Sequence, residues 1–105
     1  MAKEFEEYET LTKKLEKVLP FEAYPIRELV QQLRDKMPIS MKSKLMVNRV
    51  YNSNDIGGII CVIEFGDEVI ACGLTHLNIP SDNPLFEEIE KYQVKRAKWL
   101  RKLNG

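Results

Sequence analysis

The fold of this chain is decided by the segment Ile59-Ile60-Cys61-Val62-Ile63-Glu64-Phe65-Gly66-Asp67-Glu68-Val69-Ile70-Ala71-Cys72-Gly73-Leu74. Two apolar runs rich in β-branched residues flank the dipeptide Gly66-Asp67, which is typical of a β-hairpin. With this dipeptide at the centre of a type II′ turn, Phe65 faces Glu68 and Cys61 faces Cys72. The segment therefore predicts antiparallel strands at about 59–65 and 68–76, with Gly57 opposite His76.

Side chains alternate between the two faces of a strand, so this register sorts them into two sets. The first set is bulky and needs a cover of helices; it consists of Ile59, Cys61, Ile63, Phe65, Ile70, Cys72 and Leu74. The second set is smaller but still too apolar for a surface in water; it consists of Ile60, Val62, Glu64, Val69, Ala71 and Gly73. Helices of the same chain or a second copy could cover it, and Ala71 and Gly73 leave room for another backbone. We expect self-association, most simply as a two-fold homodimer.

The composition is that of one soluble globular domain over residues 1–105. Hydrophobic residues make up 44% of the chain and charged residues 30%, which excludes a disordered chain. The 16 basic and 16 acidic residues cancel, so net charge does not indicate a polyanionic partner. The acidic start lacks the apolar core of a signal peptide, and the longest apolar run, Ile56–Ile63, is too short to span a bilayer. We expect a cytoplasmic protein with no membrane-spanning segment.

The remaining segments predict helices and one further strand. Apolar residues at helical spacing predict helices over 3–19 and from Pro25 to about Lys36, joined as an αα-hairpin. Alternation predicts a strand over about 44–51, and Asn83-Pro84 suits the start of a last helix. The expected fold is α+β: an N-terminal helical hairpin, a three-stranded antiparallel meander and a C-terminal amphipathic helix, in the order α-α-β-β-β-α.

The candidates for metal binding are Cys61, Cys72 and His76, which is the only histidine. Along a strand, Cys72 and His76 would lie about 13 Å apart, too far for one zinc ion with ligands at about 2.0–2.3 Å. The two cysteines fall at a hydrogen-bonded pair, where side chains diverge, and a reducing cytosol opposes a disulfide. We therefore expect two buried thiols, no metal site and no cofactor.

A catalytic site would have to be built around His76. Asp55 and Ser53 lie in the loop before Gly57, and an Asp–His pair can activate a serine hydroxyl for acyl transfer. The chain lacks the G-x-S-x-G motif of a nucleophile elbow. The pattern favours a strand-end histidine bonded to backbone or water, and it leaves these three residues as the candidates for a small hydrolase.

The C-terminal helix carries a basic face formed by Lys91, Lys95, Lys98, Arg101 and Lys102. Its four lysines fall at helical spacing and form one stripe. This face could contact nucleic-acid phosphates or an acidic protein. The neutral chain and the lack of a known nucleic-acid motif favour a solvated lysine face instead.

Arg96 interrupts the apolar stripe of the same helix, which contains Leu85, Ile89, Tyr92, Leu100 and Leu103. An unpaired buried charge is costly, so the guanidinium needs a carboxylate nearby. Glu64 interrupts an apolar strand in the same way. We therefore predict a buried ion pair between Arg96 and Glu64, with Glu68 as the alternative partner.

Three functional hypotheses follow. The first is a non-catalytic, self-associating protein-interaction module, because both hairpin faces are apolar and chemically active residues are sparse. The second is a binder of nucleic acid or of an acidic partner through the basic face. The third is a small hydrolase centred on His76. The sequence favours the first and does not name a reaction.

Overall fold

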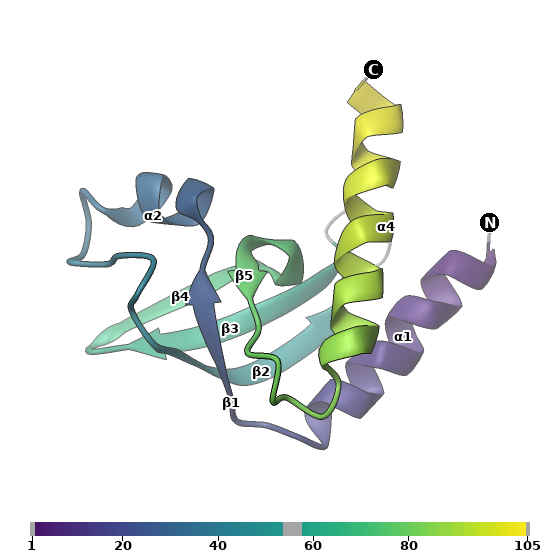
Figure 1. Cartoon of the computed structure of the whole chain (residues 1–105), viewed down its shortest axis with the longest axis horizontal. Coiled ribbons are helices and arrows are strands. Elements are labelled where there is room, and N and C mark those ends of the chain that lie inside the picture. Colours follow the sequence, from purple (N-terminus) through teal and green to yellow (C-terminus); the bar gives the residue numbers. More distant parts are fainter. Residues whose placement is uncertain (1, 54–57, 105) are drawn as a thin grey trace.

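The computed structural model describes residues 2–53 and 58–104, and it confirms the mixed α+β class (Figure 1). The strands form one curled antiparallel sheet in the order β4-β3-β2-β1-β5. The elements are α1 (Ala2–Glu16), β1 (Phe21–Pro25), α2 (Arg27–Leu33), β2 (Leu45–Asn52), β3 (Ile59–Phe65), β4 (Glu68–Gly73), the 3-10 turn η1 (Leu74–His76), β5 (Leu77–Asn78) and α4 (Phe86–Asn104).

The predicted hairpin is present as β3 and β4. Phe65 faces Glu68, Ile63 faces Ile70 and Cys61 faces Cys72, so the predicted register is confirmed. Gly66 has a φ of 62°, a left-handed conformation that glycine adopts without the steric cost of a side chain. The predicted strand at 44–51 is also confirmed, as β2, which pairs with β3 and completes a three-stranded unit inside the larger sheet.

The prediction that the second hairpin strand reaches His76 is wrong. The β3–β4 ladder ends at Ile60 and Gly73, and the chain then turns through η1 and runs as β5 along β1, at the other edge of the sheet. Leu74 is fully buried, and the Gln93 side chain donates hydrogen bonds to the carbonyl oxygens of Leu74 (2.9 Å) and Leu77 (2.7 Å). These contacts with α4 hold the chain in a turn where sequence alternation predicted a strand.

The predicted N-terminal helical hairpin is also wrong, because a strand separates α1 from α2. In β1, Phe21, Ala23 and Pro25 are buried, whereas Glu22 and Tyr24 are partly exposed. This strand pairs with β2 through Phe21 and Ala23 and with β5 through Pro25. The strand has only five residues and ends in proline, so the sequence pattern predicted a loop there. Its partners come from distant parts of the chain.

The helices pack on the inner face of the curled sheet. α1 and α4 lie together at one end of the sheet and α2 lies toward the other (Figure 1). Among the side chains of this core are Leu15, Leu29, Leu45, Val47, Ile59, Ile63, Leu74 and Ile89, all at most 3% exposed. The first set of hairpin side chains faces this core as predicted, with Phe65 only half-buried.

The helix ends differ slightly from the expected ones. α1 ends at Glu16 and α2 at Leu33, each about three residues earlier than predicted. Asn83 caps the approach to α4, because its side-chain oxygen accepts the N–H of Leu85 at 2.8 Å. In the described part of the chain, every helix is too short or too polar to cross a membrane.

The turn conformation leads to a stability prediction. Replacing Gly66 with Ala should lower the free energy of unfolding by about 1–2 kcal/mol, because a Cβ disfavours the left-handed region. Gly73→Ala is the matched control: Gly73 has a φ of −68°, and an added Cβ would make ordinary contacts of 3.5 Å or longer. Urea denaturation of the two variants should separate them. Equal stability of the two variants would contradict the turn assigned here.

Candidate functional site

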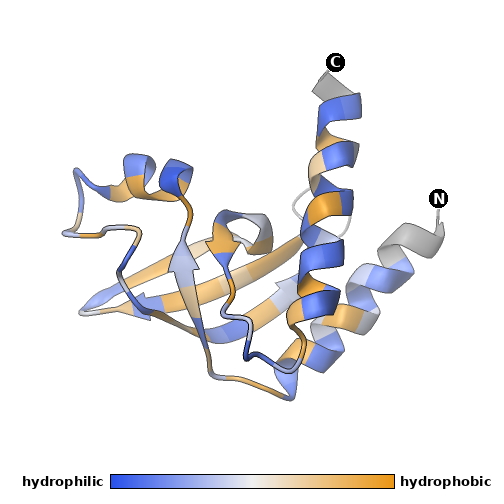
Figure 2. Ribbon diagram, in the orientation of Figure 1, coloured by the Kyte–Doolittle hydropathy of each residue, from blue (hydrophilic) through white to orange (hydrophobic). Residues whose placement is uncertain are grey.

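The outer face of the sheet is the candidate site. Cross-strand pairing aligns Ala71, Val62 and Arg49 in one row, and Gly73, Ile60 and Tyr51 in the next. We call the uncharged residues of this face the outer patch; they are Met46, Tyr51, Ile60, Val62, Val69, Ala71 and Gly73. Val69 is 69% exposed and Tyr51 is 49% exposed. Figure 2 shows hydrophobic residues along most of β3.

Helices of the same chain and a second copy were the two covers expected for this face. The described helices do not cover it. The described helices contribute their buried side chains to the inner core, and every member of the outer patch keeps partial or full exposure. The contrast is clear along β3, where Ile59, Cys61 and Ile63 are fully buried and Ile60 and Val62 are not. Exposed apolar residues gathered on one face in this way are typical of an interaction surface.

Charged residues lie within and beside the outer patch in balanced numbers. Arg49 shares a row with Val62 and Ala71, and Glu64 lies between Met46 and Val69. At the β1 side, Lys44 Nζ lies 3.5 Å from a carboxylate oxygen of Glu22. Two cations and two anions thus accompany the patch, and the surface does not favour a partner of one charge.

Arg96 is buried as predicted, with 3% exposure, but the structure does not bring it to either predicted carboxylate. Glu64 projects from the outer face of β3 and Glu68 is exposed beside the hairpin turn, whereas α4 packs on the inner side. The alternation of side chains along β3 places Glu64 on the wrong face. The guanidinium instead lies 4.8 Å from the centre of the Trp99 ring and 5.8 Å from that of Tyr8, in cation–π geometry, and Nη1 donates to the Tyr8 hydroxyl at 3.5 Å.

Tyr92 connects this cluster to the start of β3. Its hydroxyl oxygen accepts the N–H of Ile59 at 2.8 Å, and its ring packs edge-to-face on Tyr8 with centroids 5.0 Å apart. Gly58, with a φ of 65°, permits this approach, because a Cβ there would overlap the Tyr92 hydroxyl. The sequence reasoning missed this contact, although a glycine directly before an apolar strand was a signal for a close approach. The cluster positions β3 on α4.

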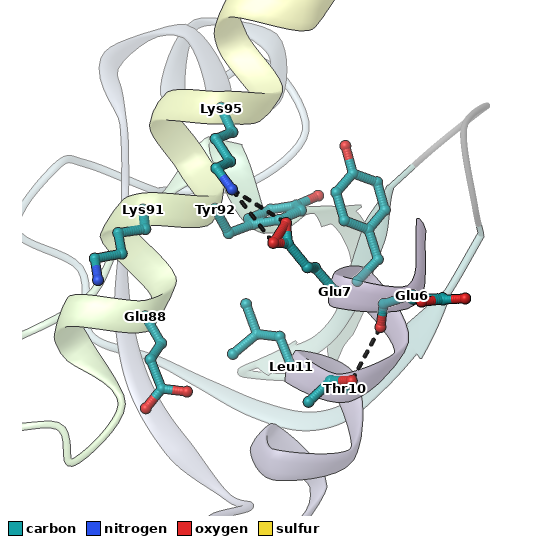
Figure 3. A pocket seen from close by; sticks show the side chains of 9 residues that line it. Glu6, Glu7, Thr10, Leu11, Glu88, Lys91, Tyr92 and Lys95 are labelled. Atoms are coloured by element: carbon teal, nitrogen blue, oxygen red, sulfur yellow. Dashed lines mark hydrogen bonds and ion pairs between the residues drawn. The ribbon is translucent and has the colours of Figure 1, made fainter. Parts of the chain in front are cut away.

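A groove of about 440 Å³ lies between α1 and α4 (Figure 3). Leu11 and Tyr92 contribute apolar surface, and charged side chains from both helices line its sides. Lys95 of the basic face reaches across to Glu7 at 3.1 Å, and Lys14 pairs with Glu88 at 2.7 Å. Glu7 of α1 therefore neutralises one member of the basic face, whose other members, Lys91, Lys98, Arg101 and Lys102, are exposed. Binding of nucleic acid or an acidic partner stays a prediction.

The structure describes two of the three hydrolase candidates, His76 and Ser53. His76 ends η1; its carbonyl oxygen accepts the N–H of Ile26 at 3.1 Å, and its buried Nδ1 has no hydrogen-bond partner among the described residues. Ser53 donates its backbone N–H to Gly58 at 2.7 Å, and Asp55 lies outside the described residues. The hydrolase hypothesis therefore stays a prediction.

The cysteines face each other as free, buried thiols. Burial raises the pKa of Cys72 from its ordinary value of 9.0 to about 11, and burial, with a smaller contribution from Cys72, raises the pKa of Cys61 further. Both thiols are therefore protonated at neutral pH and behave as small apolar side chains. In the described ranges, no three His, Cys, Asp or Glu side chains come together as a metal site would require.

No family model, no curated protein and no solved structure gives a significant match to this chain. Its function must therefore be argued from the geometry above.

The hydroxyl of Tyr92 leads to a second stability prediction. Tyr92→Phe should lower the free energy of unfolding by about 1–3 kcal/mol, because it leaves the buried N–H of Ile59 without an acceptor. Tyr24→Phe is the control, since Tyr24 is a partly exposed tyrosine of the same sheet. Chemical denaturation at neutral pH measures both. Equal effects of the two substitutions would show that the Tyr92 bond contributes nothing.

The buried thiols also predict how stability depends on pH. The native state holds the thiol protons above pH 9, where the unfolded chain releases them, so the free energy of unfolding should decrease as pH rises from about 9 toward 11. Below pH 8 these groups should cause no change. Burial also raises the pKa of Tyr92, from 10.0 to about 12, which adds to the loss. Urea denaturation between pH 7.5 and pH 10.5 measures the slope, and the double variant Cys61→Ala, Cys72→Ala should have a shallower one. An unchanged slope in the variant would contradict the assignment.

Proposed function

We propose that this protein is a non-catalytic protein-interaction module that self-associates as a two-fold dimer at the β4 side of the outer patch. The observation that carries the proposal is the exposure of this side: Val69 is the most exposed large hydrophobic residue of the described chain, at 69%. Each square ångström of apolar surface removed from water stabilises an interface by about 25 cal/mol. Joining two copies there would bury Val69 and make one wide apolar surface from two outer patches.

The chemistry of the patch supports a second copy as the partner. A two-fold interface brings a surface against itself, so it must not set like charges together. The members of the patch are uncharged, and the charges among and beside them, Arg49, Lys44, Glu64 and Glu22, sum to zero. Tyr51 and Met46, residue types that are enriched in interfaces, remain on the joined surface for a partner protein.

The position of the reactive side chains supports a binding role over a catalytic one. Cys61, Cys72 and Arg96 all lie on the inner side of the sheet, among core residues. They are separated from the outer patch by the sheet itself. The outer patch has the character of a contact surface.

Substitution of Val69 tests the proposal. The wild-type chain should sediment at twice its 12.2 kDa mass at high micromolar concentration, and Val69→Glu should raise the dissociation constant at least about tenfold, equivalent to 1.4 kcal/mol. The matched control is Val94→Glu, the same change at a half-exposed valine of α4, which should leave association unchanged. Sedimentation equilibrium over a concentration series measures all three. A wild-type chain that stays monomeric at several hundred micromolar would refute self-association.

A further inference from the structure

We infer that the two copies join edge to edge through β4, as antiparallel strands about a two-fold axis at Ala71, so that the two sheets become one continuous sheet. This inference rests on the proposed self-association and specifies the atoms that produce it.

The hairpin turn determines which backbone groups of β4 are free. In a two-residue turn the carbonyl of the first flanking residue, Phe65, accepts the N–H of the last, Glu68. The groups of Glu68, Ile70 and Cys72 therefore point toward β3, and by alternation those of Val69, Ala71 and Gly73 point away from it. β4 is the last strand in the sheet order. Gly73 is the N-cap of η1, so its carbonyl oxygen accepts the first hydrogen bond of that turn. Within the described residues, the other outward groups take part in no turn, cap or side-chain hydrogen bond. They form an open row of donors and acceptors.

Nothing in β4 blocks pairing along this row. Proteins usually protect an edge strand with proline, lysine or a bulge. The segment Glu68–Gly73 contains no proline or lysine, and its ladder with β3 runs without a register shift. Two of the three residues whose backbone groups point away from β3 are Ala71 and Gly73. The small methyl group of alanine and the lack of a side chain on glycine let another backbone approach closely.

The short strand at the other edge of the sheet favours pairing of β4 with β4 of a second copy. β5 has only two residues, Leu77 and Asn78, so a head-to-tail contact between β4 and β5 of different copies would be short. Pairing of β4 with the same strand of a second copy sets Val69–Gly73 of the two strands against each other and ends as a closed dimer.

Face alternation limits the register of this pairing to those in which opposite residues point to the same face. The two-fold axis at Ala71 meets this condition: Ala71 faces the partner's Ala71 and Val69 faces the partner's Gly73. Because the Gly73 carbonyl is engaged in η1, these pairs would form about four backbone hydrogen bonds. Val69 then packs over a glycine, and the two Glu68 side chains lie at opposite ends of the paired segment.

Amide hydrogen exchange, followed residue by residue by NMR, tests the inference directly. The N–H groups of Ala71 and Gly73 should exchange rapidly at low micromolar concentration and become at least tenfold slower where the dimer is populated. Those of Ile70 and Cys72 should be protected at both concentrations. Protection of the outward groups in the monomer would overturn the inference, because the chain would then cover its own edge.

A pair of variants at one position separates the backbone from the side chain. Ala71→Pro removes an outward N–H without removing a bond to β3, and it should raise the dissociation constant at least about tenfold. Ala71→Val adds similar bulk and keeps the N–H, so it should change the constant less than about threefold. Val62→Glu places a charge at the middle of the outer patch, away from the edge and across from Arg49, and should also leave the dimer intact.

The outcomes distinguish this inference from the proposed function. A dimer that survives Ala71→Pro but dissociates on Val62→Glu would mean that copies meet face to face, which overturns edge pairing and leaves self-association standing. A wild-type chain that never dimerises would remove both.

Discussion

The two-residue turn at Gly66-Asp67 is the constraint on which the rest of the structure depends. It fixes the register of β3 on β4, and with it the direction of every backbone group and side chain in both strands. Ile63, Ile70 and the two cysteines point into the core, where helices bury them. The alternate side chains form the outer patch, and the alternate amides of β4 form a free edge.

The two sides of the sheet differ in burial. On the inner side, α4 holds the start of β3 through the Tyr92 hydroxyl and holds η1 through Gln93. Arg96 lies in this layer against the rings of Tyr8 and Trp99, in cation–π geometry. This packing buries the inner side, whereas the members of the outer patch keep partial or full exposure.

The sequence was sufficient for the parts of the fold that local patterns encode. The hairpin register, the strand at 44–51 and the cap at Asn83 follow from turn chemistry, alternation and capping within a few residues. β1 and β5 could not be found in this way, because five and two residues form strands only through pairing with distant segments. The Arg96–Glu64 pair failed for a similar reason: residue types suggested it, but it required knowing which face of the sheet α4 covers.

The candidate site was predicted as a set of side chains but not as a surface. The outer members of β3 and β4 were identified from alternation, whereas Met46 and Tyr51 join them only through the pairing of β2 with β3. The free edge of β4 follows from the observed strand order. Sequence alone could not exclude a further strand beside it.

The most direct test of the central claim is a filtered NOE measurement on a sample that mixes isotope-labelled and unlabelled chains. The account predicts an intermolecular contact between the Hα atoms of Ile70 and the partner's Cys72, because that non-hydrogen-bonded pair brings Cα atoms to about 4.5 Å. Intermolecular contacts confined to the side chains of Tyr51 and Val62, with none from the β4 backbone, would contradict it.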